Sequence, residues 1–94
     1  MSSEPVVLHN PTERRYEIRV GGAVAVADYE LEGDRMIFTH TLVPIALRGQ
    51  GLAEKLVRAG LADARAQNRR VVPQCSYVAK FIERHAEYRD LLAD

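Results

Sequence analysis

The residues from Arg48 to Ala53 form the part of the chain whose composition points most directly to chemistry: two glycines, one arginine and no acidic residue. An amphipathic pattern begins at Leu52, but no Ser, Thr, Asp or Asn precedes it to accept the first backbone N–H groups of a helix. Those donors, at the positive end of the helix dipole, are therefore free for an external anion. Gly49 and Gly51 let the anion approach the backbone without meeting a Cβ atom. This turn is typical of a phosphate-binding site.

The spacing within the turn excludes the two commonest nucleotide motifs. A mononucleotide P-loop needs a lysine followed by Ser or Thr, and the chain contains no such pair. A dinucleotide fingerprint needs a third glycine, where this chain has Glu54, and a carboxylate there would disfavour a pyrophosphate. The pattern that remains is Arg-x-x-Gly-x-Ala, formed by Arg48, Gly51 and Ala53.

Two further side chains are candidates for chemistry, His40 before the turn and Cys75 before a predicted second helix. A histidine titrates near neutral pH and could take a proton from an amine. A cysteine just before a helix N-terminus gains thiolate character and could accept an acyl group. Structural alternatives exist, because a cysteine at a strand end is often simply buried and His40 alternates with the apolar Met36, Phe38 and Leu42. One cysteine and three histidines without paired spacing predict no metal site.

The composition restricts the class of protein. Ninety-four residues suffice for one domain with a modest core, and 47% hydrophobic with 28% charged residues is ordinary for a globular chain. The 13 acidic and 13 basic residues balance, so we expect neither a nucleic-acid nor a membrane partner. The chain has one cysteine, residues 1–5 do not resemble a signal peptide, and no run approaches about 20 apolar residues, so the sequence predicts a cytoplasmic protein. We expect a monomer or a weak dimer.

Hydrophobic periodicity predicts the elements that position the turn. Four strand-like runs at 6–9, 14–20, 23–31 and 35–43 are joined by short turns, which favours an antiparallel meander. An apolar stripe at helical spacing follows from Leu52 to Ala64, and Asn68 is a plausible left-handed terminator.

The remaining third of the chain adds a strand and a helix. A short strand at 70–74 should lie parallel to the fourth strand, because the helix acts as the crossover. Ser76 is predicted to cap a second helix ending near His85, and 87–92 is predicted to be a polar tail. The expected fold is therefore α/β (α+β), one domain over 1–94, with a mixed five-stranded sheet in which a meander is followed by helix–strand–helix.

The Arg-x-x-Gly-x-Ala pattern at a strand-to-helix turn resembles the acetyl-CoA pyrophosphate motif of the GNAT superfamily of N-acetyltransferases. The order of elements also resembles the GNAT core over nearly the whole chain. Only Pro11 to Glu13 separates the first two strands, where family members carry two helices, and the family's last strands are not present. The chain thus looks like the minimal, YjdJ-type branch, for which we expect a shallow, open acceptor site.

The resemblance implies acetyl-CoA as co-substrate, with its pantetheine arm between splayed fourth and fifth strands, where Pro44 and Pro73 interrupt the ladder. Backbone groups at Leu42 and Val43 would then bind the pantetheine amides and polarise the thioester. The residues expected to bind the co-substrate are Leu42, Val43, Arg48, Gly49, Gln50, Gly51, Leu52, Ala53 and Ser76.

The resemblance also implies an N-acetyltransferase acting on an exposed primary amine, either a small amine or a peptide lysine. The family's usual glutamate on the fourth strand is absent, and Ile82 occupies the place of its usual tyrosine, so His40 and Cys75 are the candidate catalytic residues. Adjacent parallel strands would bring these two together. The alternative function is a non-catalytic acyl-CoA-binding or sensor module. The basic pairs at 69–70 and at 80 and 84 suit either a solvated face or contact with the CoA 3′-phosphate.

Overall fold

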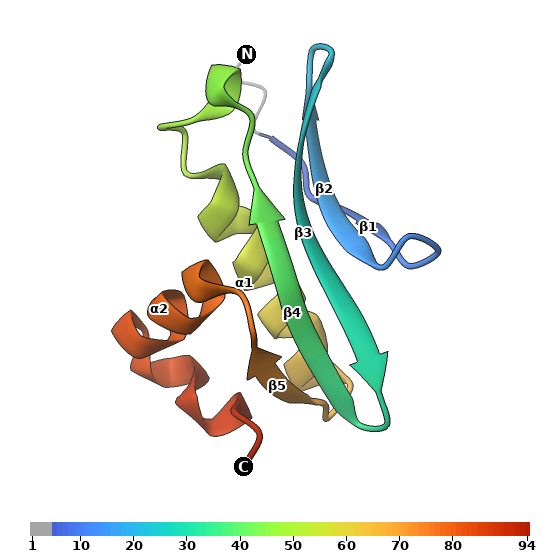
Figure 1. Ribbon diagram of the computed structural model, residues 1–94, viewed down its shortest axis with the longest axis vertical. Coiled ribbons are helices and arrows are strands. Elements are labelled where there is room, and N and C mark those ends of the chain that lie inside the picture. The colour runs from blue at the N-terminus through green and yellow to red at the C-terminus, as the bar shows by residue number, and fades with distance from the viewer. Residues whose placement is uncertain (1–4) are drawn as a thin grey trace.

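The chain folds into a five-stranded sheet in the order β1-β2-β3-β4-β5 (Figure 1). The computed structural model describes residues 5–94, so the expectation of no signal peptide, which rests largely on residues 1–4, falls outside the described part. The strands are β1 (Leu8–Asn10), β2 (Arg15–Val20), β3 (Ala23–Glu32), β4 (Arg35–Leu42) and β5 (Arg70–Pro73). The first four strands are antiparallel neighbours and β5 pairs in parallel with β4, which confirms the predicted fold class.

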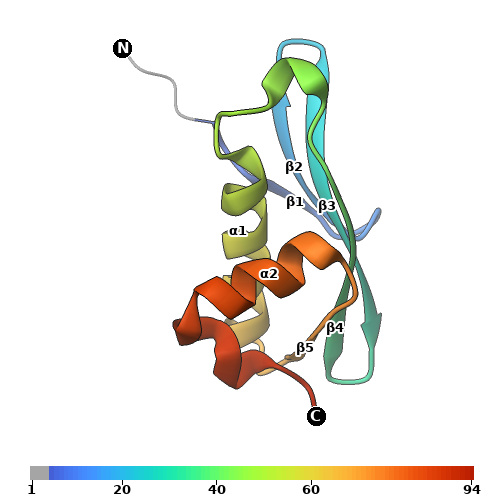
Figure 2. The same cartoon turned by 60° about the vertical axis from the view of Figure 1, so that its left-hand side comes forward.

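Two α-helices, α1 (Leu52–Ala66) and α2 (Ser76–Arg84), lie on one side of the sheet (Figure 2). Asn68 ends the α1 segment with a φ of 55°, as its left-handed tendency predicted. Two short 3-10 helices, η1 (Ile45–Leu47) and η2 (Ala86–Leu91), complete the described elements. The predicted polar tail is therefore partly helical. Neither α-helix in the described part is long and apolar enough to cross a membrane.

The core lies between α1 and the inner face of the sheet, and α1 approaches the sheet closely at Gly60. A Cβ atom added at Gly60 would lie 2.7 Å from Cε1 of Phe38 and 3.2 Å from Cε2 of Tyr16. Both rings are almost fully buried. The single glycine in the apolar stripe therefore allows the helix backbone to rest directly on two aromatic rings of β2 and β4.

A β-bulge in β4 interrupts the regular pairing with β3. Phe38 lies opposite Tyr29 and His40 lies opposite Asp28, so Thr39 has no partner on β3. An extra residue of this kind leaves the strand paired, but beyond it the side chains that would have pointed toward the core point away from it, and the reverse.

The phase shift decides which β4 side chains face the helices. Phe38 is buried before the bulge, whereas His40 and Leu42 beyond it are exposed. Thr41, half-buried, takes the inward phase instead. The predicted alternation of His40 with core residues is therefore wrong, because it assumed an unbroken strand, and His40 is not a core histidine.

The two parallel strands pair over only part of their length. The register runs from Arg35 opposite Arg70 to Phe38 opposite Pro73, and the Cys75 N–H then donates to the Phe38 carbonyl at 2.8 Å. No strand in the described part pairs with residues 39–42 of β4 on this side. The second half of β4 therefore offers an open edge beside the start of α2 (Figure 1).

Candidate functional site

The turn between β4 and α1 presents a row of unused backbone donors. Gly51 precedes the helix with a φ of 72° and a ψ of 21°, and no side chain caps it. The Lys55 N–H donates to the Gly51 carbonyl at 3.2 Å, but no N–H group of residues 49–54 donates to another described residue. These groups lie at the positive end of the α1 dipole. The arrangement is suited to binding an anion.

The glycines keep this row open to approach from outside. Gly49 and Gly51 have φ values of 82° and 72°, a conformation that side chains disfavour. No atom lies within 4 Å of a Cβ added at either position. A cavity of about 190 Å³ adjoins the row, and its walls come from the turn together with Val43, Glu54 and Tyr77.

Arg48 ties the turn to the end of β4. Its Nε donates to the Val43 carbonyl at 3.1 Å, and the side chain makes no other hydrogen bond to the described residues. The other guanidinium nitrogens remain available to an anion in the turn cavity, whose wall includes Arg48. Gln50 instead lines a separate cavity of about 510 Å³, which it shares with Val6 and Arg19. The predicted turn residues thus divide between two sides of the loop.

Cys75, not Ser76, occupies the N-cap position of α2. Cys75 is extended, with a φ of −72° and a ψ of 129°, and Ser76 is the exposed first residue of the helix. The Ser76 side chain makes no capping hydrogen bond, so the predicted serine cap is wrong. The hydrogen bond from the Cys75 N–H to the Phe38 carbonyl holds Cys75 in extended geometry, so Cys75 takes the N-cap position and the helix begins one residue earlier than a Ser76 cap predicts.

The inward phase of Thr41 brings it against Cys75. The Cys75 Sγ and the Thr41 Oγ1 lie 3.5 Å apart. Burial raises the pKa of the Cys75 thiol, but hydrogen bonds from Thr41 and from the backbone N–H groups of Val78 and Tyr77 lower it by more. The net pKa of the thiol lies below its ordinary value.

His40 lies in the opposite phase from Thr41, on the sheet face that the described helices leave uncovered (Figure 2). The structure therefore pairs Cys75 with Thr41 where the sequence predicted His40. A role for His40 as a base stays a prediction. No three His, Cys, Asp or Glu side chains among residues 5–94 gather closely enough to hold a metal ion.

Thr41 and Tyr77 are two site residues that the sequence did not assign. Thr41 could not be found because the bulge at Thr39 cannot be inferred from residue alternation. The sequence favours packing for both Tyr77 and Tyr88, with proton donation to the departing thiol as the alternative; Tyr77 is 39% exposed and forms part of the turn cavity. Tyr88 does pack, with its ring 5.7 Å from that of Phe81.

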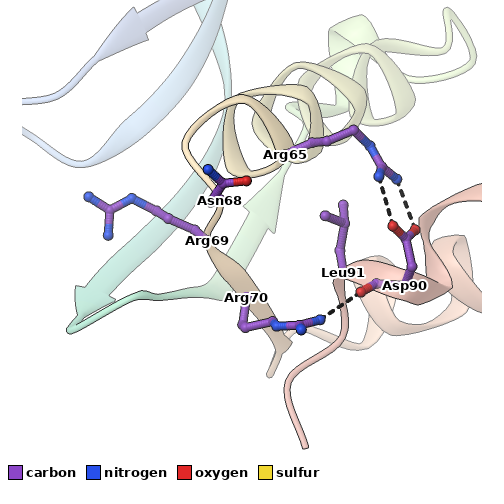
Figure 3. Close-up of a pocket in the computed structure, with 6 residues that line it drawn as sticks. All are labelled: Arg65, Asn68, Arg69, Arg70, Asp90 and Leu91. Atoms are coloured by element: carbon purple, nitrogen blue, oxygen red, sulfur yellow. Dashed lines mark hydrogen bonds and ion pairs between the residues drawn. The ribbon is translucent and has the colours of Figure 1, made fainter.

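A separate basic cavity, of about 250 Å³, lies at the far end of α1 (Figure 3). Arg65 forms a bidentate ion pair with the Asp90 carboxylate at 2.8 and 2.9 Å, and Arg70 donates to the Asp90 backbone carbonyl at 2.9 Å. Arg69 is directed away and donates to the Gly33 carbonyl at 3.1 Å. With 15 residues of helix between this cavity and the turn, roughly 22 Å, contact of Arg69 or Arg70 with an anion bound at the turn is disfavoured.

Comparison with known proteins gives consistent matches. A family model described as GCN5-related N-acetyl-transferase matches residues 15–91, a range that includes the turn, His40 and Cys75. Protein NATD1 of Bos taurus is 35% identical over 80 residues, covering 82% of this chain and 71% of that protein. Human NATD1 is 32% identical with the same coverage. The solution structure of a GCN5-like putative N-acetyltransferase from Staphylococcus aureus superimposes with a TM-score of 0.77 and 25% identity, covering 98% of this chain and 91% of that one.

Proposed function

Because the chain belongs to the GCN5-related N-acetyltransferase family, we propose that it transfers the acetyl group of acetyl-CoA to an exposed primary amine. The observation that carries the proposal is the row of unused N–H groups at 49–54, opening onto the turn cavity at the end of β4. A pyrophosphate is the part of acetyl-CoA that such a row would bind.

The open edge of β4 suits the pantetheine arm. Residues 39–42 pair with no described strand toward the start of α2, and amide groups of pantetheine can pair with them as a short strand would. Leu42 and Val43 would then contribute backbone groups nearest the thioester. Leu52 and Ala53 would face the pyrophosphate with their N–H groups, and Ser76 would lie at the α2 end of the site.

Acetyl-CoA supplies an activated acetyl thioester, and the chain has to handle three events around it. The amine nitrogen, as the free base, bonds to the carbonyl carbon while the carbon–sulfur bond breaks. A backbone donor aimed at the carbonyl oxygen stabilises its developing charge, by roughly 3 kcal/mol when well placed. The nitrogen then loses one proton and the departing sulfur gains one.

We assign to His40 the role of the base that accepts the proton of the amine. It is exposed on the uncovered face of β4, two residues before Leu42, so an amine approaching from that face meets it first. Cys75 and Thr41 lie on the helix side of the same strand. We therefore propose direct attack by the amine, with Cys75 lining the site.

His40 points away from the face of β4 on which Thr41 contacts Cys75, and this separation also supports a second candidate, a module that binds acyl-CoA without catalysis. The two candidates agree on the turn and differ on turnover. In the second, His40→Ala and Cys75→Ala would leave every measurable property of the bound complex unchanged.

Release of free CoA with a panel of amines and lysine peptides separates these possibilities. We expect amine-dependent release that falls in His40→Ala and largely survives in Cys75→Ala. Mass spectrometry after incubation with acetyl-CoA alone tests the alternative mechanism, in which the acetyl group is first transferred to Cys75. A kinetically competent adduct of roughly 42 daltons on Cys75 would contradict direct attack. Binding without release for any amine would leave only the non-catalytic module.

The open sheet face predicts weak acceptor binding. No described helix covers the face that carries His40, so the acceptor site has no enclosing wall there. We expect Michaelis constants well above the low micromolar range for small amines, with peptide lysines accepted. A low micromolar constant for one small amine would contradict this expectation.

A further inference from the structure

A second cavity continues the turn cavity along the outer side of α2. It has a volume of about 160 Å³ and is lined by Glu54, Tyr77, Lys80, Phe81, Arg84 and His85. Glu54 and Tyr77 line both cavities. The two therefore adjoin, and together they extend from the anion-binding row at the turn to the exposed surface of α2.

Two unpaired cations stand at the far end of this continuation. Lys80 and Arg84 are four residues apart on α2, so they project from the same helix face. Both are exposed, and neither forms an ion pair or side-chain hydrogen bond with any residue in the range 5–94. Both charges are therefore available to a ligand.

The only carboxylate lining the continuation is already neutralised. Glu54 accepts a hydrogen bond from Arg58 Nε at 3.1 Å. Arg58 is itself fixed by donating to the Tyr88 hydroxyl at 3.0 Å and by lying 5.1 Å above the Phe81 ring. With Glu54 held in this pair, the uncompensated charge of the cavity is the positive charge of Lys80 and Arg84.

The field of Arg84 reaches the residue that the two cavities share. Burial and the charge of Glu54 raise the pKa of the Tyr77 phenol, whereas the charges of Arg58 and Arg84 lower it. At Tyr77 the charge of Arg84 thus acts together with that of Arg58 against the opposing charge of Glu54.

We propose that Lys80 and Arg84 bind the ribose 3′-phosphate of CoA, so that the protein prefers CoA to dephospho-CoA. The inference rests on the proposed function, since it requires the CoA pyrophosphate at residues 49–54. In CoA the phosphorylated ribose is bonded directly to the pyrophosphate, so the 3′-phosphate lies next to the turn, where the second cavity begins. The distant Arg69 and Arg70 take no part.

Calorimetric titration with CoA and with dephospho-CoA tests the assignment, because the two ligands differ only in the 3′-phosphate. For the unmodified protein we expect CoA to bind roughly 5- to 10-fold more tightly, as two exposed charge contacts would give. Lys80→Gln/Arg84→Gln should lose this preference and retain its affinity for dephospho-CoA. Arg69→Gln/Arg70→Gln removes the same charge at the far end of α1 and should keep the preference.

The outcomes distinguish this inference from the function on which it rests. Equal binding of both ligands by the unmodified protein would overturn the 3′-phosphate site and leave the turn assignment standing. A preference that survives in Lys80→Gln/Arg84→Gln, or an equal loss for both ligands in that variant, would overturn the assignment to these two residues. Failure of both ligands to bind the folded protein would refute the proposed function together with the inference.

Discussion

Gly51→Glu is the substitution that best separates binding at the turn from stability of the fold. Gly51 has a φ of 72°, and a side chain in this left-handed region costs about 1–2 kcal/mol. No atom lies within 4 Å of an added Cβ, so no steric clash adds to that cost. We therefore expect a folded protein whose midpoint of thermal unfolding falls by roughly 4–8 °C for each kcal/mol lost.

The effect of Gly51→Glu on binding should be much larger than its effect on stability. The new carboxylate stands at the uncapped start of α1, where it can accept the N–H groups that the pyrophosphate needs. It also repels the pyrophosphate, by about 1 kcal/mol per charge pair at 4 Å in water and about 4 kcal/mol at an effective dielectric constant of 20. With two such pairs, we expect affinity for acetyl-CoA to fall at least about 30-fold, or about 2 kcal/mol.

Gly33→Glu is the matched control for this variant. Gly33 has a φ of 60° and equally open surroundings, but it lies in the β3–β4 turn, at the opposite end of β4 from residue 51. The same strain and the same charge should therefore lower stability without changing affinity in a calorimetric titration. If folded Gly51→Glu bound acetyl-CoA as tightly as Gly33→Glu does, the turn could not be the pyrophosphate site.

Four further predictions follow from the geometry. Gly60→Ala should lower the free energy of unfolding by about 1 kcal/mol in urea denaturation, because a methyl group pushed against the Phe38 ring costs about 1–3 kcal/mol and the better helix propensity of alanine offsets about 1 kcal/mol. Ala62→Gly, at an exposed position of α1, measures the propensity effect by itself. A Gly60→Ala variant more stable than the unmodified protein would contradict the close approach of helix and ring. Glu17 is buried between Arg15, Asn10 and Arg19, which lower the pKa of its carboxyl from 4.5 to about 2. Its contribution to stability should therefore be complete above pH 4.5 and disappear as the pH falls toward 2, so acid denaturation of Glu17→Gln should lack this component. Iodoacetamide should alkylate Cys75 with an apparent pKa below that of a free cysteine, and Thr41→Val should raise that pKa; an unchanged profile would show that the hydroxyl does not stabilise the thiolate. Arg48→Ala should weaken acetyl-CoA binding less than Gly51→Glu does, because most donors of the turn are backbone groups that remain in place; a loss as large as that of Gly51→Glu would assign the affinity to the guanidinium instead.

The sequence was sufficient for features that depend on local patterns. Period-two and period-3.6 alternation predicted the strands of the meander and the helix that begins at Leu52, and short turns left no other arrangement for neighbouring strands. The absence of a capping side chain before Leu52 predicted the unused donors, and glycine at 49 and 51 predicted a turn whose backbone an anion can approach. Each of these follows from residues a few positions apart, so the chain itself carries the information.

Tertiary contacts decided where the site residues point and which of them meet. The unpaired Thr39 moved His40 outward and Thr41 inward, because an extra residue in one strand changes which side chains face the same side as those of the neighbouring strand. The bond from the Cys75 N–H to the Phe38 carbonyl fixed Cys75 as the N-cap, so α2 begins one residue earlier than a Ser76 cap implies. The contact between Cys75 and Thr41 follows from both events, and neither leaves a local signature, since each depends on how two strands align after the chain has folded.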